Sequence, residues 1–87
     1  MTDFELLHLY AEERSESAFA ELVARHMGLV YSAALRQLGD VHQAQDVAQG
    51  VFINLARSAG KIRQGTVLAG WVLKATRYLA MESRNTS

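Results

Sequence analysis

The 87-residue sequence contains no cysteine, so it can form neither a disulfide framework nor a thiolate metal site. No apolar run approaches the roughly 20 residues that a transmembrane helix needs. The N-terminus also lacks the basic segment followed by an apolar segment that marks a secretory signal peptide. These absences predict a cytoplasmic protein that has no membrane partner. The length allows one domain with a modest core.

The formal net charge is zero, but only because the charges of an acidic and a basic segment cancel. Residues 1–56 carry three basic and eight acidic residues, and residues 57–87 carry six basic residues and one acidic residue, giving −5 and +5. A basic final third suits an anionic partner such as nucleic acid, and the acidic part then faces other partners. With so few charges, a chance distribution is the alternative explanation.

Proline is absent as well, and helix-start signals repeat along the chain. N-cap residues and glycines that suit helix ends alternate: caps at Thr2 (with Glu5 completing a capping box), Ser15 or Ser17, Asp40 and Thr66, and stops at Gly39 and Gly60. We expect helices over 3–13, from the serine cap to about 38, over 41–59 and over 67–83. An exposed loop should follow Gly60, and the tail "SRNTS" should be frayed.

Apolar residues recur at helical spacing in each of these segments. The predicted inner rows are Phe4, Leu7 and Tyr10 in the first helix, Phe19 to Leu38 including Met27 in the second, Ala44, Ala48, Val51 and Leu55 in the third, and Leu68, Trp71, Val72, Ala75 and Leu79 in the fourth. Amphipathic helices must bury such rows against one another. The predicted fold class is all-α, a single-domain bundle of about four helices, one short and three longer.

Catalytic and metal sites find little support. The histidines His8, His26 and His42 fall on three different predicted helices, and none has a partner at metal-ligand spacing. No serine lies in a nucleophile elbow, and the glycines form no phosphate-binding loop. We therefore expect no enzymatic activity, no metal and no cofactor, and we interpret His26 as a partly buried core residue.

The outer face of the third helix is more informative. It carries Asp46, Gln49, Ile53 and Arg57, spaced by 3, 4 and 4 residues, with Gly50 beside them leaving backbone uncovered. One interpretation is a solvated face with a stray isoleucine. The other is a docking face for another helix, in which the isoleucine supplies desolvation and its polar neighbours supply direction. Spacing alone leaves both open.

The loop after Gly60 and the fourth helix form the other candidate surface. Lys61 and Arg63 lie in the loop, and Lys74, Arg77 and Arg84 lie opposite the apolar row. Such cations suit a phosphate backbone, although a merely cation-decorated surface helix is the alternative. Trp71 belongs to the inner row and is first a core residue, so Tyr78 is the better exposed aromatic.

Three stretches together resemble a known family: "AFAELVARHMGLVYSAALRQLGD" (18–40), "AQDVAQGVFINLAR" (44–57) and "GWVLKATRYLA" (70–80). Their order is similar to that of bacterial RNA polymerase sigma factors of the sigma-70 family, in particular region 2 of the extracytoplasmic-function (ECF) type. The resemblance covers nearly the whole chain. It implies a transcription-initiation module without enzymatic activity of its own.

The resemblance also implies roles for both surfaces. In the family, the third helix docks on the clamp-helix coiled coil of the polymerase β′ subunit. By position the docking residues would be Asp46, Gln49, Phe52, Ile53 and Arg57, with Phe52 supporting the contact from the side. Family members usually carry glutamates where this chain has Gln45 and Gly50, so two acidic contacts are missing.

The family reads the promoter minus-ten element with the loop and the last helix, and takes a non-template base into a pocket formed partly by the loop. The matching residues here would be Lys61, Arg63, Gln64, Lys74, Arg77 and Tyr78, with Ile62 beside them. Cations would hold phosphates, and Gln64 could bond to a base edge.

The family's complete members carry a second DNA-binding domain, region 4, which this chain does not contain. We expect weak polymerase binding and inefficient initiation from residues 1–87 alone. An alternative is therefore an interaction-only protein that binds polymerase or an anti-sigma factor without directing initiation.

Overall fold

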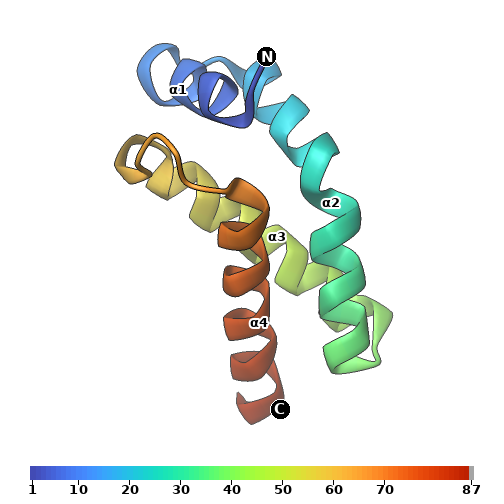
Figure 1. Ribbon diagram of the computed structural model, residues 1–87. Coiled ribbons are helices and arrows are strands. Elements are labelled where there is room, and N and C mark those ends of the chain that lie inside the picture. The colour runs from blue at the N-terminus through green and yellow to red at the C-terminus, as the bar shows by residue number, and fades with distance from the viewer. Residues whose placement is uncertain (87) are drawn as a thin grey trace.

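The computed structural model describes residues 1–86 and consists of helices joined by short connections (Figure 1). The α-helices are α1 (Asp3–Glu13), α2 (Glu16–Leu38), α3 (Val41–Ser58) and α4 (Leu68–Thr86), and a 3₁₀ turn, η1 (Ala59–Lys61), follows α3. The described residues contain no strand. The predicted all-α bundle with one short and three longer helices is confirmed.

The first three helices begin at their predicted N-caps. The Thr2 hydroxyl accepts the Glu5 amide hydrogen bond at 3.1 Å, and the Glu5 carboxylate accepts the Thr2 amide hydrogen bond at 2.7 Å. The backbone N–H of Thr2 stabilises the charged carboxylate and so lowers the pKa of Glu5. Ser15 and Asp40 likewise accept the amide hydrogen three residues later, which satisfies donors that have no partner within the helix.

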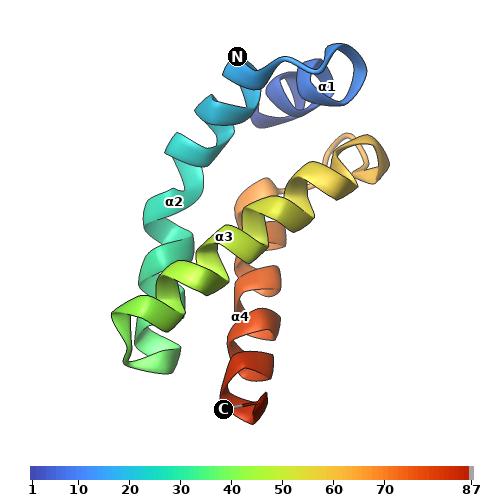
Figure 2. The ribbon, with the colours of Figure 1, turned by 180° about the vertical axis from the view of Figure 1, so that it is seen from behind.

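The three long helices lie side by side, and α1 crosses one end of the bundle (Figures 1 and 2). Helices α2 and α4 run in the same general direction and pack against each other, while α3 runs back across them and contacts both. Helix α1 packs on α2 and on η1, at the end where α3 finishes and the loop to α4 begins. The bundle measures 38 × 19 × 18 Å.

The core is built from aliphatic side chains of all four helices. The large side chains that are fully buried include Leu7, Leu22, Val30, Val51, Leu55 and Val72. Thr76 is equally buried, and its hydroxyl satisfies its hydrogen-bonding need by donating to the Val72 carbonyl oxygen at 2.7 Å. Sequence analysis did not place this polar residue in the core.

An ionic cluster fastens α1 to α2. His26 is only 8% exposed, and its Nε2 lies 2.9 Å from a carboxylate oxygen of Asp3. Arg25 donates to the other oxygen of the same carboxylate at 3.1 Å. The prediction that His26 is a partly buried core residue is confirmed, and its polar partner explains why it tolerates burial.

Several details of the predicted rows and boundaries were wrong. In α1 the buried residues are Leu6 and Leu7, and both Phe4 and Tyr10 are only half-buried, because α1 crosses the end of the bundle and not its length. Met27, predicted in the inner row of α2, is 36% exposed.

The C-terminal boundary also differs from the prediction. Helix α4 begins one residue later than expected and continues through the predicted frayed tail to Thr86. Arg84 lies in its last turn, where a positive charge interacts favourably with the helix dipole. Ser87 lies outside the described residues. Within residues 1–86, no helix combines the length and hydropathy that crossing a membrane requires.

Gly28 and Gly39 offer a paired test of helix packing and capping. Gly28 lies inside α2 with open space around its Cα, so Gly28→Ala should raise the free energy of unfolding by about 0.5–1 kcal/mol. Gly39 caps α2 at φ +67°, where an L-residue is strained, so Gly39→Ala should lower it by about 1–2 kcal/mol. Urea unfolding measures both, and equal effects of the two changes would contradict the assigned helix end.

Candidate functional site

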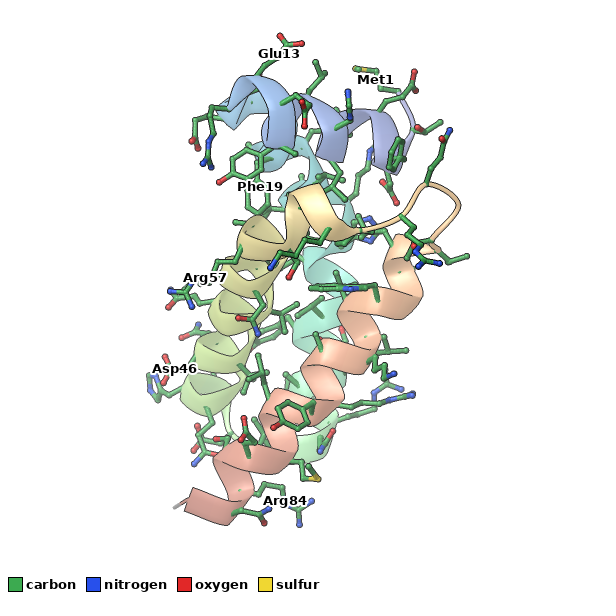
Figure 3. All side chains as sticks on the ribbon, turned by 90° about the vertical axis from the view of Figure 1, so that its left-hand side faces the viewer. Met1, Glu13, Phe19, Asp46, Arg57 and Arg84 are labelled. Carbon is green, nitrogen blue, oxygen red and sulfur yellow. The ribbon has the colours of Figure 1, made fainter. Side chains whose placement is uncertain are left out.

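The outer ridge of α3 is the first candidate surface. We use that name for Asp46, Gln49, Ile53 and Arg57, all of which are exposed. Ile53 is 52% exposed, whereas Val51 and Leu55 on the opposite side are fully buried. Figure 3 shows Asp46 and Arg57 on the outer side of α3. The predicted helical phase is therefore confirmed, and the isoleucine lies in the centre of a polar ridge.

Phe52 differs from the other predicted docking residues because it is only 6% exposed. It lines an apolar groove of about 430 Å³ between α2 and α3. The groove is formed by Phe19, Val23 and Met27 of α2 and by Gln49, Phe52, Ile53 and Ala56 of α3. The groove adjoins the outer ridge and shares Gln49 and Ile53 with it. Phe52 thus forms a wall beside Ile53 and presents little surface of its own.

Gly50 corrects one sequence-based expectation. Its backbone is only half exposed, because Leu79 of α4 lies against one side of it. A Cβ atom at position 50 would lie 3.2 Å from Leu79 Cδ1. The missing side chain therefore allows α3 and α4 to approach closely at this point.

The loop and α4 carry the second candidate surface. Lys61, Arg63 and Gln64 are exposed in the segment that leads into α4. The predicted residues of α4, which are Lys74, Arg77 and Tyr78, are exposed as well. They fall on one side of α4, opposite the buried Leu68 and Val72. Trp71 is half-buried against the core, so Tyr78 is the more accessible aromatic, as predicted.

The cations of this second surface keep their charge available to a ligand. Arg25 forms ion pairs with Asp3 of α1 and Glu21 of α2, and the ring of His26 contacts the same Asp3 carboxylate. No ion pair within the described chain engages Lys61, Arg63, Lys74 or Arg77. A phosphate group reaching these side chains would not have to displace an internal carboxylate.

Helix α2 brings two further polar residues to α4 that the sequence pattern did not predict. Arg36 and Gln37, near the end of α2, line a groove together with Arg77 of α4. The Gln37 side-chain amide donates to the Arg77 carbonyl oxygen at 3.3 Å. No spacing along the sequence could reveal this, because the residues are about 40 positions apart and meet only through helix packing.

The three histidines lie in different surroundings. His8 is exposed and stacks near Phe4, His42 is exposed near the start of α3, and His26 is held by Asp3. Within residues 1–86, no group of three or more His, Asp or Glu side chains could hold a metal ion.

Comparison with known proteins identifies the family. The model of the family "Sigma-70 region 2" matches residues 22–85. A similar curated protein is the ECF RNA polymerase sigma factor SigE of Mycolicibacterium smegmatis, with 32% identity over 71 residues, which cover 82% of this chain and 27% of that relative. The chain thus spans about a quarter of that relative's length, and no solved structure shows a significant match. The chain belongs to the sigma-70 family, as an ECF-type region 2 domain.

Proposed function

We propose that this domain docks on RNA polymerase through the outer ridge of α3 and holds the separated non-template strand of a promoter minus-ten element with its loop and α4. It would work in the cytoplasm, where transcription starts. The observation that carries the proposal is the exposure of Ile53 on a polar ridge while the opposite face of α3 is well packed. The family membership adds the class of partner.

The chemistry of the ridge suits a helical partner. Ile53 is 52% exposed and would lose its remaining contact with water on docking, which contributes about half of the roughly 1.5–3 kcal/mol for burying a fully exposed side chain of this kind. Asp46 and Arg57 lie on either side of it along the helix and carry opposite charges, which favours one orientation of the partner. The apolar groove beside Ile53 offers room for a large side chain from that partner. The proposed partner is the clamp-helix coiled coil of the β′ subunit.

The loop and α4 suit an opened strand more than they suit catalysis. Stacking one base on an aromatic side chain is worth about 1–3 kcal/mol, and opening one base-pair step costs on average about 1.4 kcal/mol. Tyr78 could therefore offset about one opened step, so the strand must also be held by phosphate contacts. Lys61, Arg63, Lys74 and Arg77 would supply these contacts, with Gln64 at a base edge. The strand is trapped by binding energy, without covalent chemistry.

Changing Ile53 tests the docking surface. Ile53→Asp should weaken binding to RNA polymerase core by about thirtyfold or more, because a hot-spot residue contributes at least about 2 kcal/mol. Binding is measured by pull-down and by titration of labelled domain with core enzyme. The melting temperature should change little, since Ile53 is already half exposed.

Two matched variants control this experiment. Val67→Asp makes the same change of charge at an exposed apolar position outside α3 and should leave polymerase binding intact. Val51→Asp changes a fully buried position and should unfold the domain. Unaltered polymerase binding by a folded Ile53→Asp protein would refute the docking surface.

Changing Lys74 and Arg77 together tests the DNA surface. On single-stranded DNA, the double variant Lys74→Gln/Arg77→Gln should reduce the slope of log K against log salt concentration by about 1.4, or 0.7 for each lost phosphate contact. Fluorescence anisotropy across a salt series measures the slope. Arg14→Gln, at the exposed C-cap that follows α1 and outside both surfaces, should not change it.

Two results would count against DNA binding by α4. An unchanged slope in the double variant would remove the proposed phosphate contacts. A wild-type domain that binds polymerase but no single-stranded DNA would favour the interaction-only alternative.

A further inference from the structure

The grooves between the long helices differ in chemistry. The α2–α3 groove is almost wholly apolar, and a hollow between α3 and α4 is lined by the carboxylates of Asp46 and Glu82. The groove between α2 and α4 is different again. It has a volume of about 340 Å³ and is lined by Leu29, Ala33, Arg36, Gln37, Leu73 and Arg77.

This α2–α4 groove joins two arginines to an apolar floor. Arg36 stands on α2 and Arg77 on α4, and no carboxylate is among the residues that line the groove. Neither arginine forms an ion pair with any described residue of the chain. Two like charges facing one groove repel each other, and an anion placed between them would relieve that repulsion.

The wall that carries Arg77 is held in place by α2. The Gln37 side chain donates to the Arg77 carbonyl oxygen, so the backbone at Arg77 is fixed relative to the end of α2. Gln37 also lines a second, neighbouring hollow with Met81, Arg84 and Asn85, which lies further along α4 toward its C-terminal end. An extended ligand such as a nucleic-acid strand could contact both hollows in turn, whereas a small ion would occupy only one of them.

We infer that the α2–α4 groove holds the backbone of a single DNA strand, with one phosphate between Arg36 and Arg77. The inference rests on the proposed function and extends its DNA surface from α4 onto α2. Leu29, Ala33 and Leu73 form an apolar floor on which a sugar can lie, whereas a duplex is too wide to enter a groove between two packed helices. Arg36 is thereby a DNA-contact residue that reaches the strand from a helix outside the loop and α4.

Arg36→Gln tests the inference with a charge-matched control. On a short fluorescent single-stranded DNA of mixed sequence, it should reduce the salt slope by about 0.7, equal to one phosphate contact. The ratio of the wild-type binding constant to that of the variant should therefore fall about 2.5-fold as the salt concentration rises from 50 to 200 mM. Arg14→Gln removes the same charge at the C-cap that follows α1 and should leave the slope unchanged.

Cross-linking gives a second, independent measurement, because the chain contains no cysteine. Arg36→Cys and Arg14→Cys each introduce a single thiol. A single-stranded DNA that carries a thiol-reactive bromoacetyl group on one phosphorothioate should label the first variant and not the second. Equal labelling of the two variants would overturn the inference.

The outcomes separate this inference from the proposed function. If Lys74→Gln/Arg77→Gln reduces the slope and Arg36→Gln does not, the strand does not enter the groove, and the DNA surface on α4 stands. If the wild-type domain binds no single-stranded DNA, both proposals fail. If Arg36→Gln weakens binding to a duplex of the same sequence as much as to the single strand, the assignment of the groove to a separated strand is wrong.

Discussion

The inner face of α3 packs against both α2 and α4, and this packing is the constraint on which both surfaces depend. Ala44, Val51 and Leu55 are fully buried there, and the small side chain of Ala44 lets the helices approach closely. Leu55 follows Ile53 by two residues, or about 200° around the helix, so their side chains point in nearly opposite directions. Turning Ile53 inward would expose Val51 and Leu55, each at a cost of about 1.5–3 kcal/mol, to gain the burial of one isoleucine. The exposed isoleucine is thus a consequence of a well-packed core.

The same packing explains how much the sequence could reveal. Caps such as Thr2 and Asp40 act within one turn, and an apolar row repeats within one helix, so helices and their inner faces are predictable from local pattern. The contact of Leu79 with Gly50 joins α4 to α3, and the shared groove of Arg36 and Arg77 joins α2 to α4. Both depend on which helices become neighbours. Local pattern carries no such information, so a glycine predicted as open backbone is in fact a close helix contact.

Residues of opposite charge line different grooves of the bundle. Asp46 and Glu82 line the hollow between α3 and α4, and the arginines gather in the groove between α2 and α4. A phosphate backbone is repelled from the first and attracted to the second. The split between the acidic and basic parts of the sequence does not predict this division, because Asp46 and Arg36 both belong to the acidic part. What a nucleic acid encounters is set by the helix pair that forms each groove.

The neutral net charge bears on how the two surfaces would work together. The chain has no overall charge, and salt screens interactions beyond about 8 Å under physiological conditions, which is less than half the width of the 38 × 19 × 18 Å bundle. The cations of α4 would therefore act on a DNA strand only at close range. Since α3 and α4 share one core, a partner that binds the outer ridge of α3 also fixes the position of α4. After docking on polymerase, α4 would meet DNA held in the same complex. The effective concentration of that DNA can reach the millimolar range. In the proposed function such a domain would need only weak intrinsic affinity for DNA, and its specificity for an opened strand would follow from where the docked α3 places α4.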